Sequence, residues 1–407
     1  MNRKASPLVI IFLFSVFHSI SQSDSSQIAS KKNGSLIIED KDVKDSPKSK
    51  KDKKRSDTLS AKSKTKNYFL TVLPAVGYTL QTGLAGLVSA NIGYYADKGP
   101  DAKMSTISTS ITYSQYNQII FPLYADLWSK GAGYNFISDN RFISYPSDIF
   151  GLGGATDPNK GHTINFKQIK FHQSALKRIR NDFYAGIGFY YDRFWDIKVI
   201  EPQTRLINVF LQREFGVSQS AIGPTARVLY DSRTNQLNPD KGFYANVVLR
   251  QNFIELGSDD EWASLLVDVR KYFNFPKGSK NTLALWSYSW LTPAGDPNYL
   301  LLPSTGWDDQ YNTGRGYIQS RFRGKQMTYF ESEYRFRISR GGLIGGVAFF
   351  NVEKFYGNQK PYDDFLPGYG AGLRIRLNKK SGANLCLDYG FGNNGSHGLY
   401  VNLGEVF

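Results

Sequence analysis

The clearest alternation of apolar and polar side chains lies between residues 326 and 339. Phe330, Tyr334, Phe336 and Ile338 share one face of an extended chain, because successive side chains of a strand point to opposite sides. The other face carries the charged side chains Glu331, Glu333, Arg335 and Arg337, together with Tyr329. The pattern predicts a strand with one apolar face and one charged face.

Stretches of this kind recur along the chain from residue 67 onward, separated by turn residues. No segment of useful length has the helical period. The predicted strands cover residues 68–80, 83–97, 102–115, 117–130, 133–145, 163–175, 182–197, 204–215, 220–232, 242–256, 261–275, 281–292, 326–340, 342–356, 368–378, 383–392 and 397–407. The stretch at 204–215 also fits a bent continuation of its neighbour. We expect about 16 strands, because an antiparallel outer-membrane barrel closes on an even number.

Two architectures keep the apolar faces of such strands away from water. A soluble sandwich hides the apolar face and exposes the charged one, whereas a membrane barrel shows the apolar face to lipid and the charged face to its lumen. Aromatic residues make up 15% of the chain, with 28 Phe and 26 Tyr, which suits the two aromatic girdles of a barrel. The fold class predicted is all-β, a closed antiparallel transmembrane β-barrel over residues 67–407.

The beginning of the sequence has the pattern of a secretory signal peptide over residues 1–23. Asn2-Arg3-Lys4 precede an apolar run at 8–17, and small residues follow it. Residues 24–66 are polar and basic, including the run KSKKDKKR at 48–55, so we expect a disordered linker. It is either a solvated tether or a segment that contacts anionic headgroups or an acidic periplasmic partner. The predicted location is the outer membrane of a Gram-negative cell.

Composition argues against several other classes of protein. The net charge of +15 raises nucleic-acid binding, but the aromatics form no short basic motif and the signal peptide directs the chain out of the cytoplasm. Cys386 is the sole cysteine and the four histidines are scattered, so no metal site and no cofactor is expected. The glycine clusters at 151–154 and 368–372 open no helix that could bind phosphate, and no nucleophile pairs with a histidine, so an enzyme is not expected.

Four short motifs carry a family resemblance. They are the Arg315-Gly316-Tyr317 loop tip, the Glu333-Tyr334-Arg335 segment of the following strand, a turn motif and the last strand. The turn motif contains Asp231, Arg233, Pro239 and Gly242, and the last strand presents Leu399, Val401, Leu403 and Phe407. In this order the motifs resemble the barrel domain of the BamA/TamA surface-antigen superfamily, in a form without periplasmic delivery (POTRA) domains.

The resemblance implies an inward-folded extracellular loop, whose Arg315 reaches carboxylates on the barrel wall. Glu333 matches one family acid. Where the family has a second acid and a glycine, this chain has Asn351 and Glu353, so Glu353 either replaces the missing acid or leaves Arg315 one partner short. On this basis an Asn351→Asp change is expected to tighten the loop. The last strand, ending in Phe407, resembles the family's insertion signal.

The function implied by the resemblance is outer-membrane assembly, the insertion or translocation of proteins or lipids. The expected partners are outer-membrane lipid, client outer-membrane proteins and a periplasmic partner that binds residues 24–66. A passive diffusion channel or a structural surface barrel is the alternative. The two readings differ in the loop at 293–325, which plugs the lumen of an assembly barrel and leaves the pore of a channel open.

Overall fold

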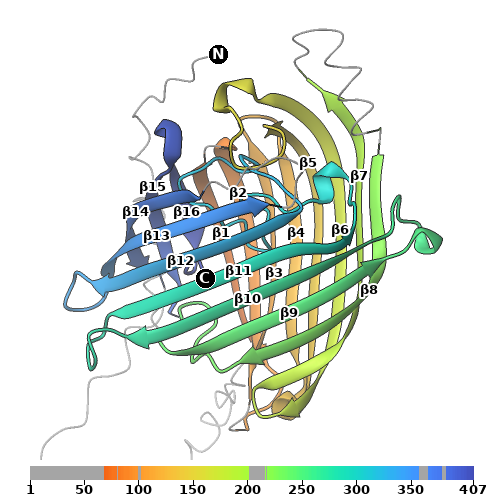
Figure 1. The fold of residues 1–407 in the computed structure, drawn as a ribbon. Helices are drawn as coiled ribbons and strands as arrows, with labels where there is room; N and C mark the ends of the chain where they lie inside the picture. Colours follow the sequence, from red (N-terminus) through yellow and green to blue (C-terminus); the bar gives the residue numbers. More distant parts are fainter. Residues whose placement is uncertain are drawn as a thin grey trace, which may run out of the picture. The chain divides into compact units, whose positions relative to one another are not determined.

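Sixteen antiparallel strands form a single sheet that curves into a barrel, in the computed structural model of the chain (Figure 1). The structure describes residues 68–79, 81–99, 102–200, 216, 218–356, 365–377 and 382–407. The predicted leader over 1–23, the linker over 24–66 and the stretch at 204–215 lie outside the described residues. Each strand pairs with its neighbours in sequence, so the predicted fold class and strand number are confirmed for the described part.

The strands have the following bounds: β1 Tyr68–Thr79, β2 Gly83–Tyr95, β3 Met104–Ser114, β4 Ile119–Trp128, β5 Tyr134–Ile149, β6 His162–Arg180, β7 Phe183–Val199, β8 Ser218–Asp231, β9 Gly242–Asn252, β10 Trp262–Asn274, β11 Thr282–Gly295, β12 Gln326–Arg337, β13 Ile344–Tyr356, β14 Leu366–Arg376, β15 Asn384–Phe391 and β16 His397–Leu403. Five short 3-10 turns occur among the described residues: η1 Lys130–Ala132, η2 Pro158–Lys160, η3 Ile254–Leu256, η4 Tyr299–Leu301 and η5 Asn393–Gly395. No helix in these ranges is long and apolar enough to cross a membrane.

The predicted facing of the side chains is observed on β12. Tyr329, Glu331, Glu333 and Arg335 are buried inside the barrel, whereas Phe330 points outward with 41% of its surface exposed. Large apolar side chains such as Ile187, Leu249 and Phe350 are exposed on other strands. Apolar residues that would be costly to hydrate in a soluble protein suit contact with lipid.

The loop at 296–325, between β11 and β12, lies inside the barrel. Its buried positions run over 300–306, 312–317 and 320–324. On one side of the lumen Gln319 accepts a hydrogen bond from Tyr145 of β5 at 2.5 Å. On the other side the loop residue Arg315 contacts β12, β13 and β15. A single loop therefore contacts both walls inside the lumen, which agrees with the inward-folded loop that the family resemblance implies.

The edges of the sheet, β1 and β16, are neighbours. Paired residues connect every two consecutive strands from β1 to β16, and the described residues show no such pairing between β16 and β1. β16 is also short, at 7 residues against 12 for β1. The β1–β16 seam is therefore the part of the barrel wall that lacks a continuous set of backbone hydrogen bonds.

Candidate functional site: the Arg315 network

Arg315 occupies the centre of a buried charged network. Its guanidinium forms ion pairs with Glu331 and Glu333 of β12 and with Asp388 of β15, the last at 2.5 Å between Nη1 and Oδ2. The four side chains are at most 1% exposed. The guanidinium carbon also lies 3.8 Å from the ring centroid of Phe349 on β13. Arg315 thus joins three strands of the wall to the loop.

Two further arginines connect this centre to the end of the chain. Arg374 of β14 pairs with Asp388 and, through Nε, with Glu405 at 2.8 Å. Arg335 of β12 lies 2.6 Å from Glu333 and 3.5 Å from Glu405. Three guanidiniums therefore share four carboxylates. Burial makes each pair strong in attraction and costly to break.

Glycines allow the loop tip to lie directly against the wall. Gly316 has a φ of +115°, in the left-handed region where a side chain would be strained, and an added Cβ would lie 2.6 Å from the Phe391 carbonyl oxygen. At Gly390 of β15 an added Cβ would lie 2.8 Å from the Gly316 nitrogen. The glycine cluster at 368–372 lies in β14, as expected for a strand, and Gly368 leaves similar room beside the Arg315 carbonyl.

The tip is fixed by hydrogen bonds to strands β16 and β14. Tyr400 accepts a hydrogen bond from the Gly316 amide and donates one to the Tyr317 carbonyl, both at 2.8 Å. The Tyr317 hydroxyl donates to the Pro367 carbonyl at 2.6 Å. Burial raises the pKa of the Tyr317 hydroxyl to about 12, so this group remains a donor at neutral pH.

The two residues that replace the expected family acid and glycine have separate roles. Asn351 donates from Nδ2 to the Arg315 carbonyl at 2.9 Å, so it contacts the backbone of the loop and makes no bond to the guanidinium. Glu353 accepts from the Thr305 hydroxyl at 2.9 Å, and its Oε2 has no hydrogen-bond partner in the described part of the chain. Neither residue supplies the second acid. Glu331 and Asp388 do, and the sequence interpretation did not select them.

This geometry reverses the expected effect of an Asn351→Asp change. A carboxylate cannot donate to the Arg315 carbonyl, and it would place a negative charge beside that oxygen. We expect Asn351→Asp to loosen the loop by about 1–3 kcal/mol, the cost of a lost buried hydrogen bond. The measurement is the rate at which a protease cuts residues 296–325. An Asn351→Ser variant is the control, because it changes the side chain at this position without adding a charge. Slower cleavage of the Asn351→Asp variant than of the wild type would contradict the expectation.

The turn motif forms a compact bidentate pair between β8 and β9. Arg233 donates from Nε and Nη2 to the two carboxylate oxygens of Asp231 at 2.9 and 2.8 Å. Gly242 has a φ of +115°, and an added Cβ there would lie 2.5 Å from the Ser232 carbonyl oxygen. Pro239 offers its carbonyl to Arg335 at 3.5 Å. The motif therefore lies next to the Arg315 network without entering it.

The end of the chain departs from its predicted position. β16 ends at Leu403, Gly404 has a φ of +91°, and residues 404–407 turn into the barrel. The predicted strand over 397–407 is wrong for these four residues, and Phe407 does not share an outer face with Leu399 and Val401. Of Leu403 the structure describes the backbone alone. A glycine in the left-handed conformation ends the strand because it reverses the chain direction.

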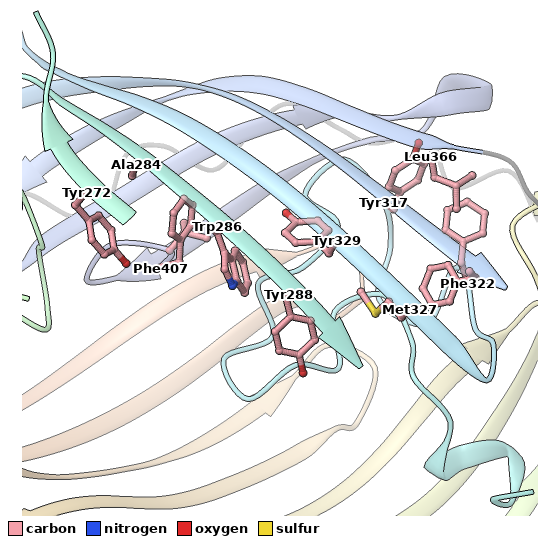
Figure 2. Close-up of a cluster of buried hydrophobic side chains, with 12 residues drawn as sticks. Tyr272, Ala284, Trp286, Tyr288, Tyr317, Phe322, Met327, Tyr329, Leu366 and Phe407 are labelled. Carbon is pink, nitrogen blue, oxygen red and sulfur yellow. The ribbon is translucent and has the colours of Figure 1, made fainter. Parts of the chain in front are cut away.

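Phe407 is instead buried among lumen side chains, at 3% exposure (Figure 2). Its ring stacks on Trp286 of β11 at 5.1 Å between centroids, and Arg335 donates to its carbonyl oxygen at 3.0 Å. Asn312 of the loop donates to the Val406 carbonyl at 2.7 Å. We call residues 404–407 the tail. It contacts both the loop and the Arg315 network.

Among the described residues no group of three or more His, Cys, Asp or Glu side chains could hold a metal ion.

The strand pattern in the sequence already places Glu331 and Asp388, which the motif comparison did not select, on inward faces of the barrel. Glu331 shares the inward face of β12 with Glu333, and Asp388 shares that of β15 with Cys386. The partnerships depend on which strands the loop approaches, and that information is three-dimensional.

Comparison with known proteins identifies solved structures whose fold is similar to that of this chain. No family model and no curated protein matches the chain. Among solved structures, BamA from Haemophilus ducreyi lacking POTRA domains 1–3 has a TM-score of 0.53 at 12% identity, covering 82% of this chain and 70% of that one. CdiB from Escherichia coli has a TM-score of 0.55 at 12% identity, with 82% and 62% covered.

CdiB from Acinetobacter baumannii has a TM-score of 0.51 at 13% identity, and the match covers 83% of this chain and 60% of that one. The chain therefore spans about three fifths of the length of both CdiB proteins. The shared feature is the large antiparallel barrel. In fold, the chain resembles the outer-membrane β-barrels of BamA and CdiB.

Proposed function

We propose that this barrel assists outer-membrane assembly, by offering the edge strand β1 to client proteins at the β1–β16 seam, and that it does so without enzymatic chemistry. The observation that carries the proposal is the seam itself. Every other pair of adjacent strands is joined by a ladder of paired residues, interrupted by bulges only in β6–β7 and β10–β11, and the described residues of β1 and β16 have no such ladder. An unpaired edge presents free N–H and C=O groups with which another strand can pair.

A client strand that enters at the seam requires fewer backbone hydrogen bonds to be broken than one that enters elsewhere in the wall. Parting two paired strands elsewhere in the wall breaks a full set of backbone hydrogen bonds, and in lipid each unsatisfied group costs several kcal/mol. At the seam the paired set is absent, so this cost is smaller. The Arg315 network and the tail hold β12–β15 and the loop together. The wall next to the seam thus keeps its form while the seam parts.

The outward face of the barrel carries exposed apolar side chains that are suited to contact with membrane lipid. Leu70, Val72 and Val76 of β1 are exposed, as is Leu373 of β14. Residues 24–66 lie outside the described part, and we propose that their basic run at 48–55 binds an acidic periplasmic partner. The Arg315-Gly316-Tyr317 tip serves in this proposal as a lock that keeps the loop in the lumen. The turn between β8 and β9 contacts the tail, because the Glu405 amide donates to the Leu237 carbonyl at 3.1 Å.

Crosslinking tests the proposal directly. A photoreactive side chain at Val72 of β1 is expected to capture newly exported outer-membrane proteins, because β1 is the edge to which a client strand pairs. The matched control is the same group at Val228 of β8, which is similarly exposed but fully paired on both sides. Equal capture at the two positions, or none at Val72, would count against assembly.

A diffusion channel predicts different behaviour. Because the loop binds both walls of the lumen, we expect the full chain to give little or no steady conductance in a planar lipid bilayer. Removal of residues 300–324 is expected to produce a stable open pore. A wild-type conductance equal to that of the loop deletion would favour the channel and would remove the support that the plugged lumen gives to assembly.

A further inference from the structure

A cavity of about 100 Å³ lies in the lumen between the loop and the opposite wall. Strands β5 to β11 and the loop contribute to its lining, and it is separate from the Arg315 network. Basic side chains of β5, β6, β8 and β9 face it, namely Arg141, Lys170, His172, Arg227 and Arg250. The cavity has room for one small polar group with a few waters.

Nearly all of these basic groups have a carboxylate partner. Arg141 pairs with Asp139 at 2.6 Å, and Lys170 lies 2.9 Å from Asp139 and 3.1 Å from Asp309. Arg250 and His172 both contact Asp192, at 2.5 and 2.8 Å. These pairs satisfy the expectation that buried charges are compensated.

Arg227 of β8 is the exception. It is 8% exposed, and its Nε donates to the Asn246 side-chain oxygen at 2.7 Å. Within the described residues it has no carboxylate at ion-pair distance, and its Nη1 and Nη2 make no hydrogen bond. Both Nη atoms remain accessible from the cavity that Arg227 lines. A buried guanidinium that lacks a counter-charge favours binding of an anion.

The neighbouring amide strengthens this arrangement. Asn246 of β9 is 2% exposed, its oxygen is held by Arg227, and its Nδ2 has no partner in the described chain. Nδ2 is therefore a further donor on the same cavity wall. Two parallel guanidinium N–H groups match the two oxygens of a carboxylate or phosphate, and an amide can bind a third oxygen.

We propose that this cavity is a binding site for a small oxyanion, a phosphate or carboxylate group, with the Nη atoms of Arg227 as its main ligands and Asn246 Nδ2 beside them. The carboxylates Asp192 and Asp309 also line the cavity, but they pair with other basic groups, and the bound anion supplies the ion-pair partner that Arg227 lacks. The proposal is independent of the assembly role.

The proposed oxyanion site is tested by measuring equilibrium binding of anions to the full chain in detergent micelles. The buffer contains no phosphate and no carboxylates. Inorganic phosphate and acetate are the two probes, and they distinguish a phosphate site from a carboxylate site. We expect at least one probe to bind the wild type and to raise the melting temperature. Arg227→Gln is expected to weaken that binding about tenfold or more. The control is Arg340→Gln, which removes a charge at an exposed position.

A second variant keeps the test decisive if Arg227→Gln folds poorly. Asn246→Asp places a carboxylate against Arg227 and so supplies the counter-charge within the chain. We expect it to fold, to melt higher than the wild type without added anion, and to lose binding of the probe. No binding of either probe to the wild type would overturn the proposal. So would an equal loss in Arg340→Gln, or full binding by Asn246→Asp.

Discussion

Replacement of Arg315 by alanine is expected to lower the free energy of unfolding by about 3–5 kcal/mol, the cost of removing one partner from a buried ion pair. The change removes the positive charge that faces Glu331, Glu333 and Asp388. Arg335 and Arg374 still compensate Glu333 and Asp388. Glu331 keeps Tyr329 as a donor but loses its cation, so most of the cost arises there.

Urea unfolding of the refolded barrel measures this effect, and protease cleavage of residues 296–325 reports on the loop. Arg315→Lys keeps the charge but cannot bridge three carboxylates, so we expect an intermediate midpoint. Adding Glu331→Gln to the alanine variant is expected to recover part of the lost stability. Arg340→Ala is the control for loss of an exposed arginine. An alanine variant with the wild-type midpoint and the wild-type cleavage rate would refute the lock.

The facing of side chains is the part of this fold that a sequence specifies well. On β12 the period of two places Glu331, Glu333 and Arg335 inside and Phe330 outside, as observed. Lipid and lumen are such different solvents that a shift of one residue would exchange every side chain between them. The number of strands follows from the same pattern together with closure on an even count.

The partners of the loop could not be derived in this way. Asn351 lies on the predicted inward face, yet its amide binds a backbone carbonyl because the loop tip passes close to β13 and β14. A motif comparison assigns a charge partner by position and contains no information about that approach. The burial of the site is a second feature that a motif does not specify. Arg315 is only 1% exposed, and its guanidinium carbon lies 3.8 Å from the centroid of the Phe349 ring.

The strand pattern places residues 404–407, the tail, wrongly for a related reason. Apolar residues at 399, 401 and 407 fit a strand that continues to the last residue, and alternation cannot show where a glycine turns the chain. Gly404 makes that turn, and Glu405 then reaches Arg374 and Arg335. One charged network consequently extends from the loop tip through β12, β14 and β15 to the tail. We expect Arg315 and Glu405 to be coupled in a double-mutant cycle. Arg374 connects them, because it pairs with Glu405 and also with Glu333 and Asp388, two carboxylates that Arg315 contacts.

Replacement of Phe407 by alanine is expected to lower the free energy of unfolding by about 3–5 kcal/mol, the usual cost of emptying a buried aromatic site. Figure 2 shows the ring beside Trp286 and Tyr272. The Arg335 guanidinium carbon lies 5.2 Å from the centroid of the same ring. The loss therefore includes stacking and cation–π contacts as well as apolar burial. An insertion signal that acts only during delivery would leave the stability of the folded barrel unchanged.

The measurement separates these two roles of Phe407. Refolding in detergent requires no assembly machinery, so a lower urea midpoint there reports the structural contribution alone, whereas the yield of barrel in the outer membrane of cells reports both. The matched control is Leu399→Ala, which truncates a less buried apolar residue on β16 and is expected to change the midpoint by less than about 1 kcal/mol. A Phe407→Ala barrel with the wild-type midpoint in detergent but a reduced yield in cells would show that the residue acts as a signal and contributes nothing to the packed lumen. The burial of its ring against Trp286 leads us to expect both effects, with the larger loss in cells.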